Sequence, residues 1–198
     1  MSDQPNSPIT GKFLGRIVRL QIHPESLKRG DVYDPTPLLE VERGSINASG
    51  MLGWDGTGWA VDIHHGAHPR VKGGGHKALS IGFVAHYERM AERFGDAPIG
   101  IAGENIVVDG PAVSAQDVAA GLVVRTQDGV VFELRSPTPA VACPGFTSHL
   151  LKSVTVLPRA EIVEHLAFLS TGTRGFILSV DHIDRPVEVS VGDEVFTR

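Results

Sequence analysis

Short strand-like runs of apolar residues, bounded by turn residues, constrain the fold of this 198-residue chain more than any other feature. Valine, isoleucine, leucine and phenylalanine dominate these runs, and glycine or proline lies close to most of their ends. The pattern predicts strands at residues 12–22, 38–46, 59–64, 106–108, 122–126, 130–134, 176–180 and 187–196. Many short strands with few helices are typical of a mainly β (α+β) fold, a curved sheet or barrel, rather than a doubly wound α/β sheet.

Two segments have the residue spacing of helices. Residues 80–94 carry apolar side chains at three- and four-residue steps, with Ser80 as a candidate cap and Gly95 as a candidate end. A second helix is predicted over residues 158–169. The Gln-Asp-Gly turn at residues 127–129 predicts a hairpin between the strands on either side of it.

The length and the absence of a linker predict one domain at residues 12–198, preceded by a flexible N-terminus at residues 1–11. The formal net charge of -5 disfavours nucleic acid as a partner. No apolar run approaches the roughly 18 residues of a membrane span, so no membrane partner is expected. With a single cysteine and no signal-like N-terminus, we expect a cytoplasmic protein.

The single cysteine, Cys143, lies in a segment stiffened by Pro137, Pro139, Pro144 and Gly145. A loop of this kind, leading out of a strand, can present a thiol to a pocket. An unpaired cysteine is either a small core residue or a reactive group, and the reactive form requires nearby cations or backbone N–H groups that favour the thiolate. Composition favours the core interpretation, and the thiolate chemistry remains the alternative.

A glycine-rich segment at residues 72–79 (KGGGHKAL) leads into the first predicted helix. Its backbone N–H groups could approach an anion at the start of that helix, and Lys77 would add a positive charge. The segment lacks the spacing of a P-loop, and the alternative is an ordinary turn. Its first four residues are also the last four of the glycine-rich stretch 50–75, for which we predict a long functional or mobile loop.

Several titratable residues suggest further chemistry. His64, His65, His68 and His76, with Asp62 nearby, could bind zinc or iron, although solvated histidines are the simpler interpretation. Elsewhere, the turn that contains Glu104 offers a general acid or base, or else a solvated carboxylate.

The order of five motifs resembles that of MOSC domains, the family named for the C-terminal domain of molybdenum-cofactor sulfurases. The motifs are residues 74–79 (GGHKAL), 103–105 (GEN), the proline-flanked Cys143, 172–176 (GTRGF) and 191–195 (VGDEV). The resemblance extends from Phe13 to the C-terminus and is closest to stand-alone MOSC proteins. It implies a β-barrel with a few peripheral helices, in which the cysteine and the basic residue after the double glycine converge on a pocket.

The resemblance also implies molybdenum or sulfur chemistry. In such proteins the cysteine is thought to ligate the molybdenum of a pterin cofactor, or to accept sulfur as a persulfide, and some relatives reduce N-hydroxylated compounds. Cys143 is the matching catalytic and metal-ligating position. Pyridoxal phosphate would enter only through a partner cysteine desulfurase, and a redox partner is the other expectation. The matching cofactor-binding positions are Gly74, Gly75, His76, Lys77, Glu104, Asn105 and Arg174.

One departure from the family pattern lies just before the cysteine. The family commonly has Pro-Arg-x-Pro-Cys, whereas residues 139–143 of this chain are Pro-Ala-Val-Ala-Cys, without the arginine. Either Arg70, Lys72 or Arg174 replaces that cation, or the chain has lost part of the cofactor apparatus. The second case favours a non-catalytic module that binds a small molecule.

Overall fold

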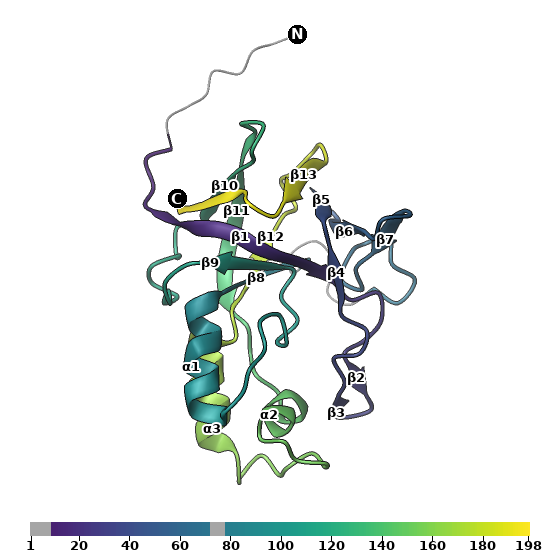
Figure 1. Cartoon of the computed structure of the whole chain (residues 1–198), viewed down its shortest axis with the longest axis vertical. Coiled ribbons are helices and arrows are strands. Elements are labelled where there is room, and N and C mark those ends of the chain that lie inside the picture. Colours follow the sequence, from purple (N-terminus) through teal and green to yellow (C-terminus); the bar gives the residue numbers. More distant parts are fainter. Residues whose placement is uncertain (1–8, 72–77) are drawn as a thin grey trace.

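The computed structural model describes residues 9–71 and 78–198 (Figure 1). Its helices are α1 (Val84–Phe94), α2 (Pro144–Leu150) and α3 (Val163–Phe168), and α3 continues into an irregular π-helical turn, η2 (Leu169–Thr173). Its strands are β1 (Phe13–Ile22), β2 (Lys28–Arg29), β3 (Val32–Tyr33), β4 (Leu39–Val41), β5 (Arg43–Asn47), β6 (Gly50–Trp54), β7 (Trp59–Val61), β8 (Leu79–Phe83), β9 (Ile106–Asp109), β10 (Leu122–Arg125), β11 (Val131–Pro139), β12 (Phe176–Ser179), β13 (Val187–Ser190) and β14 (Glu194–Thr197).

Among the described residues, seven strands close into a barrel, as the sequence predicted. Their order is β14, β10, β11, β12, β8, β9 and β1, and pairing between β1 and β14 completes the circle. β8 and β9 run parallel, whereas the other barrel pairs are antiparallel. The long strand β1 pairs with β14, β9 and β4. Its register shifts once along β14 and once along β9, and β4 pairs with its C-terminal end.

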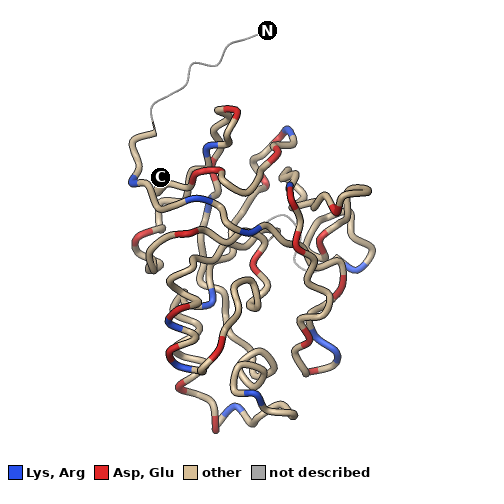
Figure 2. Tube along the Cα trace, viewed as in Figure 1, with Lys and Arg blue, Asp and Glu red and all other residues tan. Residues whose placement is uncertain are grey.

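A cluster of charges lies on the seam where the barrel closes. Glu194 of β14 pairs with Arg16 of β1 at 2.6 Å and with Arg125 of β10. One carboxylate therefore connects three adjacent strands. Figure 2 shows that basic and acidic residues are interspersed along the described chain rather than grouped by sign.

Two smaller sheets and the helices surround the barrel (Figure 1). Strands β13, β5, β6 and β7 form an antiparallel sheet, and β2 pairs with β3 in a short hairpin. Helix α2 packs on β3, where the Cβ of any residue replacing Gly145 would lie 2.2 Å from the backbone oxygen of Asp31. None of the helices in the described parts of the chain has the length and hydrophobicity needed to cross a membrane.

The apolar interior has two parts. One fills the barrel and contains fully buried residues such as Ile17, Ile81 and Phe176. The other lies between the barrel, the helices and the β2–β3 hairpin, and it contains Tyr33 and Phe146. Burying an aromatic side chain of this size contributes about 1.5–3 kcal/mol, so the second core holds α2 and the residues next to it in place.

Both predicted helices begin later than predicted, and the second also ends later. Residues 79–83 form strand β8, so α1 begins at Val84 and the Ser80 side chain does not cap it. The predicted end is correct, because Gly95 adopts a left-handed conformation there (φ 85°). The second helix begins at Val163 instead of 158 and extends past 169 into η2. β2, β3 and α2 were not predicted, and β6 lies in the stretch predicted as a long loop. The predicted strands 38–46 and 187–196 are each divided into two, β4 with β5 and β13 with β14.

Candidate functional site

A cavity of about 300 Å³ lies where β1 ends and where β8 and β9 begin. Its walls also include the β2–β3 hairpin and the segment between β11 and α2. The described residues that line it are His23, Ser26, Leu27, Lys28, Tyr33, Ile63, His64, Leu79, Ser80, Ala102, Gly103, Glu104, Asn105, Ala140, Val141, Arg174 and Ile177.

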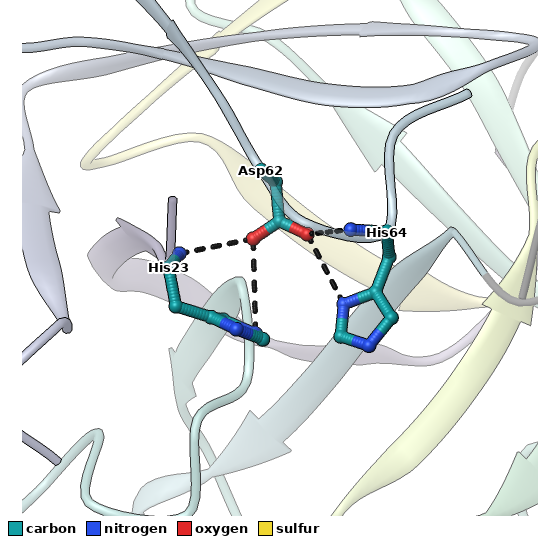
Figure 3. A group of neighbouring side chains, drawn as sticks. All are labelled: His23, Asp62 and His64. Atoms are coloured by element: carbon teal, nitrogen blue, oxygen red, sulfur yellow. Dashed lines mark hydrogen bonds and ion pairs between the residues drawn. The ribbon is translucent and has the colours of Figure 1, made fainter. Parts of the chain in front are cut away.

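The buried carboxylate of Asp62 lies behind one wall of this cavity (Figure 3). It accepts hydrogen bonds from the backbone N–H groups of His23 at 3.0 Å and His64 at 2.8 Å, and from the side-chain amide of Asn105 at 3.1 Å. Nδ1 of His64 lies 3.1 Å from the same carboxylate. Burial alone raises the pKa of Asp62, but hydrogen bonds from His64 and the charge of His23 outweigh it and lower this pKa to about 2. Asp62 is therefore an anion at neutral pH.

Two imidazoles flank Asp62 (Figure 3). The ring of His23 is buried, and its Nε2 lies 3.7 Å from Asp62 Oδ2. Burial lowers the pKa of His23, although Asp62 and the backbone of Glu25 act in the opposite direction. The side chain of His64 is one third exposed (34%) and lines the cavity. The two rings meet edge to face, with centroids 4.9 Å apart.

Asn105 connects the strands around the cavity. Its side-chain oxygen accepts hydrogen bonds from the backbone and the hydroxyl of Ser80, both at 3.0 Å. Its amide group donates to Gln21 as well as to Asp62. Because both ends of the side chain are already bonded, Asn105 orients Asp62 and β8.

Glu104 is a buried acid whose pKa is raised above its usual value. Its Oε2 accepts a hydrogen bond from the hydroxyl of Tyr87, and its Oε1 has no partner among the described residues. Burial raises the pKa of Glu104 to about 7, against the opposing effects of the Tyr87 hydrogen bond and the charge of Arg174. A Cβ at Gly82 or Gly175 would lie 2.7 or 3.0 Å from Oε1, so both glycines make room for the carboxyl group. Glu104 can therefore exchange a proton near neutral pH.

Cys143 lies next to the cavity at the start of α2. The thiol is half-buried, and the backbone oxygen of Cys143 accepts a hydrogen bond from the Thr147 hydroxyl at 3.0 Å. Val141, two residues earlier, lines the cavity, whereas Cys143 is not among the described lining residues. The cysteine therefore follows the cavity wall closely in sequence, and its side chain packs against the second apolar core.

Arg174 fixes this segment to the cavity wall. Its Nη1 donates to the backbone oxygen of Val141 at 2.7 Å, and its guanidinium lies over the Phe146 ring, 4.8 Å from the centroid. Its buried Nε has no partner within the described chain. Burial raises the pKa of Tyr33, Arg174 opposes this, and Glu104 and Cys143 add to it. These groups are therefore close enough to influence one another.

The structure brings some of the predicted site residues together. Glu104, Asn105 and Arg174 line the cavity, whereas Cys143 is not among its lining residues and packs against the second apolar core. The predicted positions Gly74, Gly75, His76 and Lys77 lie outside the described residues, as does Lys72.

The metal-binding histidines predicted from local spacing differ from the cluster that the structure brings together. Nδ1 of His65 accepts a hydrogen bond from Ala67, and His68 bonds to the backbone at Pro24 and Arg70, so both organise their own loop. The cluster that could hold a metal ion contains His23 instead, with Asp62 and His64.

Comparisons with known proteins agree on the type of fold. The family model of the MOSC domain matches residues 68–196. No curated protein matches the chain. The crystal structure of the YuaD protein from Bacillus subtilis superposes with a TM-score of 0.53 at 13% identity, covering 94% of this chain and 97% of that one. A hypothetical protein superposes with a TM-score of 0.51 at 17% identity, covering 94% of this chain and 70% of that one. At such identities the likeness concerns the fold alone.

Proposed function

Because the chain belongs to the MOSC domain family, we propose that its cavity binds a molybdenum-pterin cofactor and uses it to reduce a small N-hydroxylated molecule. The observation that carries the proposal is the attachment of the cysteine segment to a cationic cavity wall by Arg174. A soft thiolate suits molybdenum, and a guanidinium suits a phosphate. Arg174 lines the cavity, and Cys143 follows the lining residue Val141 by two positions.

The residues present fit such a cofactor. Arg174, with a buried Nε that has no described partner, and Lys28 would hold the phosphate. Leu27, Ile63 and Leu79 provide apolar wall against which a flat ring can pack. Cys143 would ligate the metal. Arg174 thereby takes the place of the arginine that is missing before the cysteine.

Molybdenum bound there would transfer the two electrons that reduction of an N-hydroxyl group requires, and an external redox partner protein would have to supply these electrons. Loss of that hydroxyl as water also consumes protons. Glu104 lines the cavity and has a raised pKa, so it is the candidate proton donor near pH 7. Tyr87 holds its Oε2 and so fixes the direction in which Oε1 points.

The test is the molybdenum and pterin content of protein purified from a host that makes the cofactor. We expect about one equivalent of each in the parent, loss of molybdenum in Cys143→Ser, and weaker retention of both in Arg174→Gln. Arg159→Gln, at an exposed arginine, is the matched control and should resemble the parent. A parent without molybdenum and pterin would overturn the proposal, and a parent that retains pterin but no molybdenum would favour a non-catalytic binding module.

A second candidate function is sulfur transfer. The placement of Cys143 beside the cavity rather than in its lining favours it, because a persulfide carrier must be reached by its donor protein. The donor would be a cysteine desulfurase, which brings its own pyridoxal phosphate. Intact mass after incubation with a desulfurase and free cysteine tests this. A reductant-labile gain of sulfur in the parent, absent from Cys143→Ala, supports it, and equal masses for the two proteins contradict it.

A further inference from the structure

The buried His23 ring is weakly paired among the described residues. Nδ1 has no hydrogen-bond partner of ordinary geometry there, although the backbone of Glu25 is near enough to raise the pKa of the ring. Nε2, the nitrogen that faces Asp62, approaches Oδ2 only to 3.7 Å. His65, His86 and His182 also have one buried nitrogen without a partner, but each hydrogen-bonds through its other nitrogen. Buried polar groups are nearly always paired, and an exception calls for a water, an ion or a functional role.

The atoms around His23 have the spacing of metal ligands. One nitrogen of His23, one of His64 and one carboxylate oxygen of Asp62 all lie within 4.8 Å of one another. Two ligands on a tetrahedral zinc ion lie about 3.4 Å apart. His64 Nδ1 lies 3.1 Å from Asp62 Oδ1, and His23 Nε2 lies 3.7 Å from Asp62 Oδ2, so the two contacts fall on either side of that distance. The three side chains are therefore close enough together to be ligands of one ion.

The surroundings hold these ligands in position. Two backbone N–H groups and the Asn105 amide orient the Asp62 carboxylate, as hydrogen bonds do around bound metals. Both imidazoles also line the cavity, so an ion between them would have a side that faces it. Two imidazoles and one carboxylate are the donor set of catalytic zinc sites and of non-haem iron sites.

We propose that His23, Asp62 and His64 bind a divalent transition-metal ion, whose remaining coordination positions face the cavity. This site is separate from Cys143 and does not depend on the proposed cofactor. An ion there would bind an oxygen or nitrogen atom of a molecule in the cavity, and so orient that molecule relative to Glu104 and Cys143.

The experiment uses the full chain with Cys143→Ala, purified without a metal-affinity tag and stripped with a chelator. Removing the thiol ensures that it contributes no ligand. Co²⁺ is titrated and followed by its visible absorption, and Zn²⁺ is titrated against a chromophoric chelator. We expect about one equivalent of either ion in this background. His64→Gln should weaken binding by at least about 100-fold, more than loss of an outer-shell partner does.

Two further variants make the result decisive. His165→Gln removes an imidazole outside the cluster and should bind the ion as the background does. His64→Cys retains a ligand, so it should restore binding and add a sulfur-to-cobalt charge-transfer band. Circular dichroism shows whether each variant is folded. No binding in the background, or equal binding by folded His64→Gln, would overturn the proposal.

Discussion

Replacing Phe146 with alanine should destabilise the protein strongly and disturb the cysteine segment. The ring is fully buried in the second core, meets Tyr33 edge to face at 5.0 Å and lies beneath the Arg174 guanidinium. Truncating a buried phenylalanine to alanine costs about 3–5 kcal/mol in free energy of unfolding. The lost cation–π contact adds about 0.5–2 kcal/mol. The expected total is therefore about 3.5–7 kcal/mol.

Urea unfolding followed by circular dichroism measures this loss. Phe13→Ala is the matched control, because Phe13 also packs edge to face on another ring but is 49% exposed. We expect it to cost about 1–2 kcal/mol, in proportion to the smaller apolar area that it buries. Equal losses for Phe146→Ala and Phe13→Ala would refute the view that the second core holds α2 and the segment that carries Cys143.

Two other substitutions test the environment of Glu104. Burial raises the pKa of Glu104 from 4.5 to about 7, so the folded state binds the proton more tightly than the unfolded state does. The contribution of this group to stability is therefore lost as the pH rises from about 4.5 to 7. At about 1.36 kcal/mol per pKa unit the loss is about 3 kcal/mol, and urea unfolding across this range should show it in the parent but not in Glu104→Gln. Gly175→Ala should lower the free energy of unfolding by about 1–3 kcal/mol more than Gly129→Ala does. Both glycines have left-handed φ values, but only at Gly175 would an added Cβ meet another atom, the Ile81 backbone oxygen at 2.5 Å. Thermal unfolding of the two variants compares them, and equal melting temperatures would contradict the close packing.

Local patterns predicted those parts of the fold that depend on neighbours in sequence. The Asp-Gly turn at 127–129 correctly indicated the hairpin of β10 and β11. The start of α1 was wrong because β8 pairs with both β12 and β9, and these long-range pairings outweigh the capping tendency of Ser80. Helix α2 was missed because a segment rich in proline suggests a loop, although proline suits the first turn of a helix.

The candidate site shows the same contrast between features predicted from the sequence and contacts between distant residues. Motif resemblance identified Glu104, Asn105 and Arg174, which the structure places at one cavity. Local spacing could not identify His23, because it lies 39 residues before Asp62 and reaches it only when the end of β1 packs beside the loop after β7. Partners that are distant in sequence leave no periodic signal.

The closure of the barrel between β1 and β14 has a consequence for biosynthesis. The two strands are separated by almost the whole chain, so the ribosome must complete β14 before β1 can acquire that neighbour. At about 5–20 residues per second, the nascent β1 spends roughly ten seconds or more with an unpaired edge. Exposed strand edges recruit other chains, and charged side chains along them hinder this. Arg16 and Arg125, which later share Glu194, would thus protect the nascent chain from aggregation before they join the seam.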